Sequence, residues 1–286
     1  MTTILNLYHQ AASTLSATGI PDPETEAIIL LRHTLHCPRS DIFLKGRQLA
    51  TSNVIATVER ILARRLTREP LAYILGEQEF YGRSFAVTPA VLIPRQETEL
   101  LIEKASSVLW DTVGRRRRRI IDLGTGSGVI AITLALEQPH DIVLAVDRSL
   151  DALLVARGNA IRHGVLSQVC FLNSDWSSAL KGGAQFDLVA ANPPYVARRD
   201  QPTLQPELAA EPEMALFGGE DGRDEIKRII NESGRLLLPG GVLLMEIGYD
   251  QESCVLAALD GTGGYDDIVV HRDYAGMPRL LYAKRR

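Results

Sequence analysis

Apolar residues recur every three or four positions along residues 1–75, which predicts three or four short helices and no strand. One apolar stripe runs from Ile4 to Leu15, and another follows Thr51-Ser52. Between them, Asp22-Pro23-Glu24 is typical of a helix start, with an acid at the N-cap and proline at the first helical position. We therefore expect a small N-terminal helical bundle over residues 1–75.

The periodicity changes in the next segment, residues 76–95. Between Phe80 and Val87, apolar and polar residues alternate around Gly82. This alternation predicts a short β-hairpin that links two domains.

From about residue 119 the chain alternates between apolar, β-branched runs and helical segments such as 151–163 and 224–238. The last two runs lie too close together for a helix between them. Because buried parallel strands appear as continuous apolar runs, the pattern predicts an α/β domain over residues 96–286, with a Rossmann-like, doubly wound sheet of seven strands and an antiparallel edge hairpin. The predicted strands are 120–123, 142–146, 169–172, 186–190, 242–245, 268–270 and 280–283.

The composition is that of a globular protein. Of the 286 residues, 45% are apolar and 23% are charged, and the net charge is −4. Proteins that hold duplex nucleic acid usually have a basic excess, so stable nucleic-acid binding is not expected. The five consecutive arginines at 115–119 leave two interpretations open, a nucleic-acid patch or a solvated charge run at the entrance to the first strand, and we favour the second.

Cysteine usage and hydropathy indicate the cytoplasm. Cys37, Cys170 and Cys254 are far apart and odd in number, which fits a reducing compartment better than a disulfide framework. There is no signal-peptide pattern, and no stretch approaches the roughly 20 apolar residues of a membrane span. The cluster of His33, His36 and Cys37 looks like an exposed helix end, so no metal site is expected.

A glycine-rich turn follows the first predicted strand and opens a helix. Alternate glycines allow a tight turn with space for a ligand against the backbone, and the helix N-terminus points free N–H groups at that ligand. The spacing is G-x-G-x-G rather than the G-x-G-x-x-G of dinucleotide sites, which favours S-adenosylmethionine as the cofactor. The segment reads Asp122-Leu123-Gly124-Thr125-Gly126-Ser127-Gly128.

Two further residues are candidates for the same cofactor site. Asp147 directly follows the second predicted strand, where a carboxylate can accept hydrogen bonds from both ribose hydroxyls. Its alternative role is the N-cap of the next helix. Trp176 follows the third strand and offers a ring for the adenine, although packing under a loop would explain it as well.

The tetrapeptide Asn192-Pro193-Pro194-Tyr195 follows the fourth predicted strand, at the edge of the sheet where ligands bind. The Asn192 side-chain oxygen and the Pro193 carbonyl can each accept one N–H of a planar amino group. Two acceptors would direct the nitrogen lone pair towards a sulfonium methyl group, and Tyr195 could stack on the planar group. These residues predict nitrogen methylation.

Beyond these motifs, the chain resembles the HemK/PrmC family of protein-(glutamine-N5) methyltransferases almost from end to end. Gln96 departs from the proline that the family usually has there. The segments that resemble the family are Pro70–Gly76, Glu79–Gly82, Val91–Arg95, Glu97–Glu99, Asp122–Gly128, Asn192–Tyr195, Leu216–Gly222 and Asp273–Arg279.

The resemblance implies a class I methyltransferase fold and a helical domain that helps to dock a class 1 peptide chain release factor. It implies transfer of a methyl group to the glutamine of the Gly-Gly-Gln motif, with S-adenosylhomocysteine as product. By position, Gly124–Gly128, Asp147, Trp176 and Asn192 would hold the cofactor, and Asn192–Tyr195 would hold the glutamine. Two rival functions remain: a nucleic-acid amino-methyltransferase, which would need a basic recognition surface for base flipping, and a non-catalytic binding module.

Overall fold

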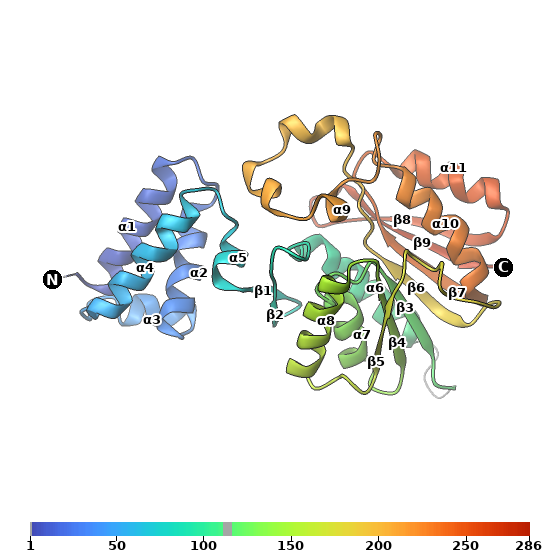
Figure 1. Cartoon of the computed structure of the whole chain (residues 1–286), viewed down its shortest axis with the longest axis horizontal. Coiled ribbons are helices and arrows are strands. Elements are labelled where there is room, and N and C mark those ends of the chain that lie inside the picture. Colours follow the sequence, from blue (N-terminus) through green and yellow to red (C-terminus); the bar gives the residue numbers. More distant parts are fainter. Residues whose placement is uncertain (1, 111–115) are drawn as a thin grey trace. The chain divides into compact units, whose positions relative to one another are not determined.

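The computed structural model describes residues 2–110 and 116–286, without the side chain of Trp110. The chain forms two compact units. One comprises Met1–Glu77 together with the later segment Gln205–Ala210, and the other comprises Gln78–Leu204 and Glu211–Arg286. Figure 1 shows the helices of the first unit in blue and cyan.

The first unit is a helical bundle, as the apolar periodicity predicts. Thr3 and Thr51 cap two of its helices by accepting hydrogen bonds from Asn6 and Val54 backbone N–H groups. Asp22 does occupy an N-cap position, but its backbone is left-handed and its side chain makes no capping bond in the described structure. The helices are α1 (Ile4–Ala17), α2 (Pro23–Leu35), α3 (Arg39–Leu44), α4 (Ser52–Arg65) and α5 (Leu71–Leu75).

These five described helices exceed the three or four expected, because α3 and α5, with six and five residues, are too short for an apolar stripe to recur over several turns. Buried aliphatic side chains from α1, α2 and α4 form the core of the bundle. Beside this core the Arg65 guanidinium, only 3% exposed, forms two hydrogen bonds to Glu26 and one to Glu207 of the later segment. A buried cation is thus paired with two carboxylates.

The second unit contains the predicted seven-stranded sheet, with strand order β5-β4-β3-β6-β7-β9-β8. Strands β3 to β7 pair in parallel, and β9 runs antiparallel to both β7 and β8. The expected doubly wound sheet with an antiparallel edge hairpin is therefore confirmed. Its strands are β3 (Arg119–Leu123), β4 (Ile142–Asp147), β5 (Val169–Asn173), β6 (Phe186–Ala191), β7 (Leu237–Glu246), β8 (Tyr265–Arg272) and β9 (Pro278–Arg285).

Helices cover both faces of this sheet (Figure 1). One hydrophobic cluster joins the sheet to α6, α7 and α8, and a second joins the opposite strand residues to α10 and α11. Ile120 belongs to the first cluster and Ile121 to the second, as expected for a strand buried on both sides. These helices are α6 (Glu99–Trp110), α7 (Val129–Glu137), α8 (Leu150–Arg162), α10 (Asp224–Leu236) and α11 (Glu252–Thr262).

Shorter elements connect these layers. The expected hairpin near Gly82 is observed as a two-stranded sheet. The helix expected over 224–238 ends two residues early, because Leu237 pairs with Phe186 in the sheet and Pro239 cannot continue a helix. The remaining elements are β1 (Glu77–Phe80), β2 (Arg83–Ala86), α9 (Glu213–Leu216) and three 3₁₀ segments, Gln96–Thr98, Arg198–Thr203 and Pro206–Ala210.

The arginine run at the entrance to β3 takes part in the fold. Arg116 forms an ion pair with Asp187, with 2.7 Å between Nη2 and Oδ1. Arg118 pairs with the buried Asp141 at 2.8 Å. These ion pairs argue against a free nucleic-acid patch, but Arg118, whose side chain is only 13% exposed, is not solvated as we expected. Arg115, the first residue of the run, lies outside the described residues.

Candidate active site

The topology of the sheet sets the position of the site. Strands β3 and β6 are neighbours at its centre, and the strand order runs outward from them in both directions. The loops that follow such a pair diverge to opposite faces and leave a crevice at the carboxyl ends of the strands. The glycine-rich turn follows β3, and Asn192 follows β6.

Glycine is required in this turn for conformation and for space. Gly124, Gly126 and Gly128 all have positive φ, at 77°, 55° and 84°. A Cβ on Gly128 would lie 2.8 Å from Ile132 Cδ1, and a Cβ on Gly124 would lie 3.1 Å from the Trp176 ring. The turn thus brings its backbone close to α7 and to the loop after β5.

Asp122, at the base of the turn, is fully buried. Its Oδ2 accepts hydrogen bonds from the Thr125 hydroxyl at 2.6 Å and from the Ala131 N–H at 3.2 Å. Its Oδ1 has no partner among the described residues. Burial raises the pKa of Asp122 from 3.8 to about 7, against the opposing effect of the two donors.

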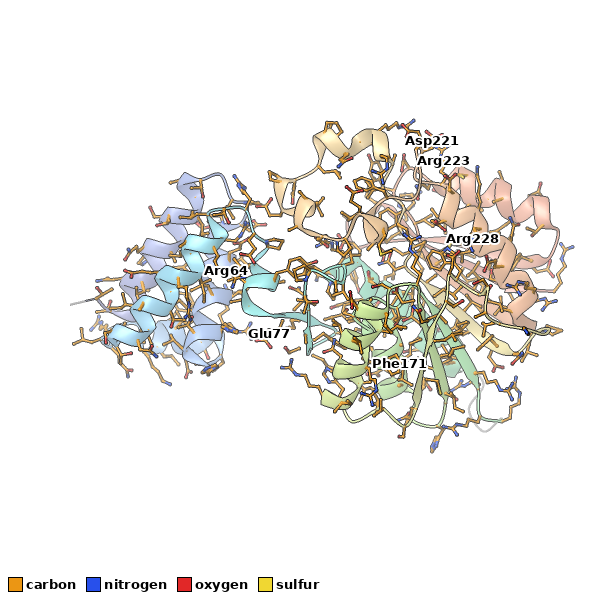
Figure 2. The ribbon with its side chains drawn as sticks, viewed as in Figure 1. Arg64, Glu77, Phe171, Asp221, Arg223 and Arg228 are labelled. Carbon is orange, nitrogen blue, oxygen red and sulfur yellow. The ribbon has the colours of Figure 1, made fainter. Side chains whose placement is uncertain are left out.

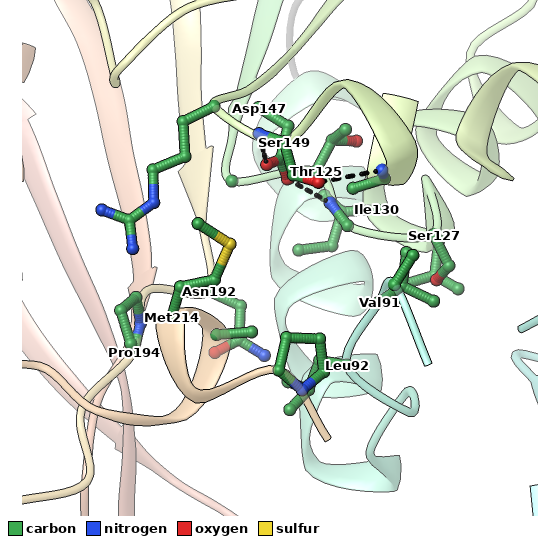
Figure 3. Close-up of a pocket in the computed structure, with 18 of the residues that line it drawn as sticks. Val91, Leu92, Thr125, Ser127, Ile130, Asp147, Ser149, Asn192, Pro194 and Met214 are labelled. Carbon is green, nitrogen blue, oxygen red and sulfur yellow. Dashed lines mark hydrogen bonds between the residues drawn. The ribbon is translucent and has the colours of Figure 1, made fainter. Parts of the chain in front are cut away.

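Asp147 ties the end of β4 to the glycine-rich turn. Its Oδ2 accepts the Gly126 N–H and its Oδ1 accepts the Ser149 N–H, both at 2.9 Å (Figure 3). Burial raises the pKa of this carboxyl, while the two N–H donors act in the opposite direction. The next helix is capped by Ser149, which accepts the Ala152 N–H, so the N-cap alternative for Asp147 is wrong.

Trp176 lies beside the turn, in a left-handed conformation with φ of 47°. Its indole N–H donates to Glu225 on α10 at 2.6 Å. Arg228, one turn further along α10 (Figure 2), donates two hydrogen bonds to Asp175 at 2.8 and 3.0 Å. The ring also packs against the second core cluster, so it is both a packed residue and part of the wall of the crevice.

The crevice is a pocket of the second unit that brings together most of the candidate residues. Figure 3 shows Thr125, Asp147 and Asn192 around the same space, with Met214 from α9 beside them. Gly128, Pro193 and Tyr195 do not line this pocket. The lining includes Val91, Leu92, Pro94, Arg95, Thr98, Gly124, Thr125, Gly126, Ser127, Asp147, Ser149, Trp176, Asn192, Pro194, Met214 and Glu225.

Two side chains of the tetrapeptide, those of Asn192 and Tyr195, form hydrogen bonds with buried polar groups. The Asn192 amide nitrogen donates to the Thr98 hydroxyl at 3.0 Å, and the Tyr195 hydroxyl donates to Glu246 at 3.0 Å. Thr98 in turn donates to the other oxygen of Glu246 at 2.6 Å. Burial raises the pKa of both Tyr195 and Glu246, and the Glu246 carboxylate raises that of Tyr195 further.

The backbone of the tetrapeptide is held equally closely. The Gln251 side-chain amide donates to the carbonyls of both Tyr195 and Gly222, at 3.0 and 2.9 Å. A Cβ on Gly222 would lie 2.2 Å from the Tyr195 carbonyl oxygen, and one on Gly218 would lie 2.2 Å from that of Pro194. These two glycines therefore let the segment 216–222 pack directly against the tetrapeptide.

Sequence reasoning missed the chemical importance of Thr98, Glu246 and Glu225. Glu246 had a usable signal, because it is a carboxylate at the carboxyl end of a buried strand. Thr98 had only its place in the segment Glu97–Glu99, which resembles the family, since its partners lie 94 and 148 residues away in sequence.

Comparison with known proteins identifies the family. Residues 6–76 match the PrmC N-terminal domain, and residues 98–220 match the methyltransferase small domain. The chain is 39% identical over 285 residues to the release factor glutamine methyltransferase of Nitratidesulfovibrio vulgaris, covering 99% of this chain and 95% of that one. The enzyme of the same description from Koribacter versatilis is 41% identical over 284 residues, covering 99% of both chains. This chain belongs to the release factor glutamine methyltransferase family.

Membership of this family confirms the prediction of a methyltransferase with S-adenosylmethionine as methyl donor. The fold agrees. The hMettl16 catalytic domain, solved in complex with MAT2A 3′UTR hairpin 6, superposes with a TM-score of 0.56 over 79% of this chain and 81% of that one. Its sequence identity is 19%, so the likeness concerns the fold alone. Among the helices of residues 2–110 and 116–286, none is long and apolar enough to cross a membrane.

The residues of the pocket fit this donor. A Cβ on Gly124 would lie 3.1 Å from the Trp176 ring, so the glycine lets this aromatic wall of the pocket lie directly against the turn. Asp147 lines the pocket and has acceptor capacity beyond its two backbone donors, since each carboxylate oxygen has more than one lone pair.

Proposed function

We propose that this protein transfers a methyl group to the side-chain N5 of the glutamine in the Gly-Gly-Gln motif of class 1 peptide chain release factors. The observation that supports this most directly is that the glycine-rich turn and Asn192 line the same pocket. A methyl donor and an amide held at these two places would meet at the centre of the sheet. Family membership supports the substrate.

For the cofactor, we propose that Gly124 to Gly128 hold S-adenosylmethionine along the turn. Asp147 would accept the ribose hydroxyls and Trp176 would contact the adenine, because both side chains line the pocket beside that turn. When bound, the cofactor supplies an electrophilic methyl group on a positively charged sulfur. Asn192 borders the same space and would contact both ligands.

For the glutamine, we propose that the Asn192 Oδ1 and the Pro193 carbonyl each accept one N–H of the amide. An amide nitrogen is a weak nucleophile because its lone pair is delocalised, and two fixed acceptors orient that pair towards the methyl group. Pro194 and Tyr195 would complete the surface around the planar group. The nitrogen needs no base beforehand, because its proton leaves after the methyl group has been transferred.

We propose that the enzyme acts in the cytoplasm. Its helical unit, residues 1–75, docks the release factor, and its hairpin, residues 76–95, links that unit to the catalytic domain, residues 96–286. We propose no stable nucleic-acid complex. The pairing of Arg116 and Arg118 with carboxylates supports this, because it removes two of the cations that a nucleic-acid patch would use.

The test is to incubate the enzyme with isotopically labelled S-adenosylmethionine and either a release factor or duplex DNA. We expect the label on the release factor, with a mass increase of one methyl group on the peptide that contains the Gly-Gly-Gln glutamine. A release factor with alanine in place of that glutamine should remain unlabelled. Label on DNA alone would overturn the proposal in favour of a nucleic-acid enzyme.

A variant pair separates catalysis from binding. Asn192→Ala removes one acceptor and should lower the rate of methylation by about 100-fold or more, the loss typical when a preorganised polar contact to a transition state is removed. Asn231→Ala is the control, because Asn231 is exposed on α10 and does not line this pocket. If Asn192→Ala methylates like the control, the tetrapeptide does not act in the reaction.

A further inference from the structure

Two buried residues connect the tetrapeptide to the interior of the second unit. Thr98, 2% exposed, lies just before α6, and Glu246, 1% exposed, ends β7. The Asn192 Nδ2 lies 3.0 Å from the Thr98 Oγ1, and that oxygen lies 2.6 Å from the Glu246 Oε2. The chain of contacts therefore runs from the pocket wall to a buried carboxylate.

The chemistry of these groups gives the chain of hydrogen bonds a direction. A carboxylate only accepts hydrogen bonds, so the single hydroxyl proton of Thr98 must point at Glu246. The Thr98 oxygen then has only lone pairs to offer to Asn192. The side-chain amide of Asn192 must turn its NH₂ towards Thr98, and its Oδ1 is left to face the other way.

Glu246 is well placed to stay an acceptor. Its second oxygen accepts the Tyr195 hydroxyl at 3.0 Å, so both carboxylate oxygens have donors. Burial raises the pKa of Glu246, but the two donors and the positive charge of Arg279 act against that rise. Replacing either donor would leave a buried acceptor unsatisfied, which is costly.

We propose that Thr98 and Glu246 are positioning residues that fix the Asn192 amide with its oxygen towards the substrate, and that they thereby make the site select a carboxamide over a carboxylate. A glutamine NH₂ can donate to that oxygen. A glutamate carboxylate cannot, and would bring a second acceptor against it. The selectivity rests on the proposed function, whereas the orientation of Asn192 does not.

The alternative orientation explains why a fixed amide matters. An asparagine amide has nearly the same shape after a rotation of half a turn about its terminal bond. Without Thr98, Asn192 could present its NH₂ to the pocket, and a carboxylate would then be accepted. Sites built to hydrogen-bond one polar group reject an analogue without it strongly, because their own buried groups stay unpaired.

The decisive variant is Thr98→Val, which keeps the shape of the side chain and removes the hydroxyl. Thr98→Ser should restore the hydroxyl and the behaviour of the wild type. Thr133→Val is the matched control, because Thr133 is a buried threonine on α7 whose hydroxyl has no partner in the described structure. Any effect of burying valine in place of threonine would appear in this control as well.

The first measurement compares the KM for the release factor with glutamine in the Gly-Gly-Gln motif with the inhibition constant of a release factor that carries glutamate at that place. For Thr98→Val we expect the preference for glutamine to fall about tenfold or more, the equivalent of one lost hydrogen bond. In the control Thr133→Val, whose side chain does not line the pocket, both this preference and the affinity for S-adenosylmethionine should stay within about twofold of the wild type. An unchanged preference in Thr98→Val would overturn the proposal.

The second measurement needs no substrate. In a ¹⁵N–¹H spectrum, the Asn192 side-chain NH₂ signals, assigned by their loss in Asn192→Ala, should exchange slowly with solvent in the wild type, Thr98→Ser and Thr133→Val. They should exchange faster in Thr98→Val. Equal exchange in all four proteins would refute the orienting role. If the wild type fails to methylate a release factor, the proposed function fails, and this spectrum alone decides the role of Thr98.

Discussion

Replacing Gly218 with alanine tests whether the tetrapeptide depends on the segment behind it. The new Cβ would lie 2.2 Å from the Pro194 carbonyl oxygen, whereas ordinary van der Waals contact begins at 3.4 Å. The tetrapeptide must therefore move by about 1 Å or the segment 216–222 must retreat by as much. Overpacking of this kind costs about 1–3 kcal/mol of folding free energy.

The expected consequence for catalysis is larger than that for stability. A displacement of about 1 Å in a group that positions a substrate can lower the rate by about 100-fold. A stability loss of about 1–3 kcal/mol should lower the melting temperature by only several degrees. We therefore expect Gly218→Ala to remain folded at room temperature, to bind S-adenosylmethionine and to lose most of its release-factor methylation.

The assay is kcat/KM for release-factor methylation, measured beside thermal unfolding and calorimetric binding of the cofactor. Gly183→Ala is the control, since no atom lies within 4 Å of a Cβ at that position and its φ is not positive. Gly218→Ala with kcat/KM within about twofold of the control would refute the reasoning, because the tetrapeptide would then tolerate the displacement.

Three further predictions concern buried charge and the pocket wall. Asp122 has its pKa raised by burial to about 7, so its ionisation opposes folding. Stability should fall as the pH rises from about 4 to about 7, and Asp122→Asn should make that fall smaller in urea titrations. Arg65→Ala should destabilise the protein by about 3–5 kcal/mol in the same titrations, because Glu26 and Glu207 lose their cation, and a smaller loss in the double variant with Glu26→Gln would confirm the cause. Trp176→Phe keeps a ring but loses the N–H that donates to α10, and calorimetry should show cofactor affinity reduced by about tenfold; unchanged affinity would mean that this bond does not hold the ring in place.

The sheet could be predicted from the sequence because its physical cause is local. Strands buried on both faces need predominantly apolar runs, and Ile120 to Leu123 and Phe186 to Ala190 show them with one aspartate each. The position of Asn192 followed from the same logic, since parallel strands present their carboxyl ends at one edge. The glycine-rich turn was visible because three alternate residues at positive φ strongly favour glycine.

The groups that support the site could not be predicted, because their causes are non-local. The hydrogen bond between Thr98 and Glu246 joins residues 148 positions apart, and no periodicity or spacing marks it. The same holds for Gly218, whose φ is unremarkable and whose need for glycine comes from the carbonyls of Pro194 and Gly222, at 2.2 and 3.0 Å from a Cβ. At Asp22 a strong local signal gave the right helix start but not the capping bond, because the residue adopts a left-handed backbone.

The helical unit is built from two separate stretches of the chain, Met1–Glu77 and Gln205–Ala210, which leave the ribosome at different times during synthesis. Arg65 precedes its partner Glu207 by 142 residues. At a synthesis rate of roughly 5–20 residues per second, Glu207 follows Arg65 by on the order of ten seconds. Until then the nascent bundle holds a guanidinium with only Glu26 to neutralise it, so the helices emerge first but their folding is completed late. A gene fragment that stops at Glu77 would produce only this unfinished form.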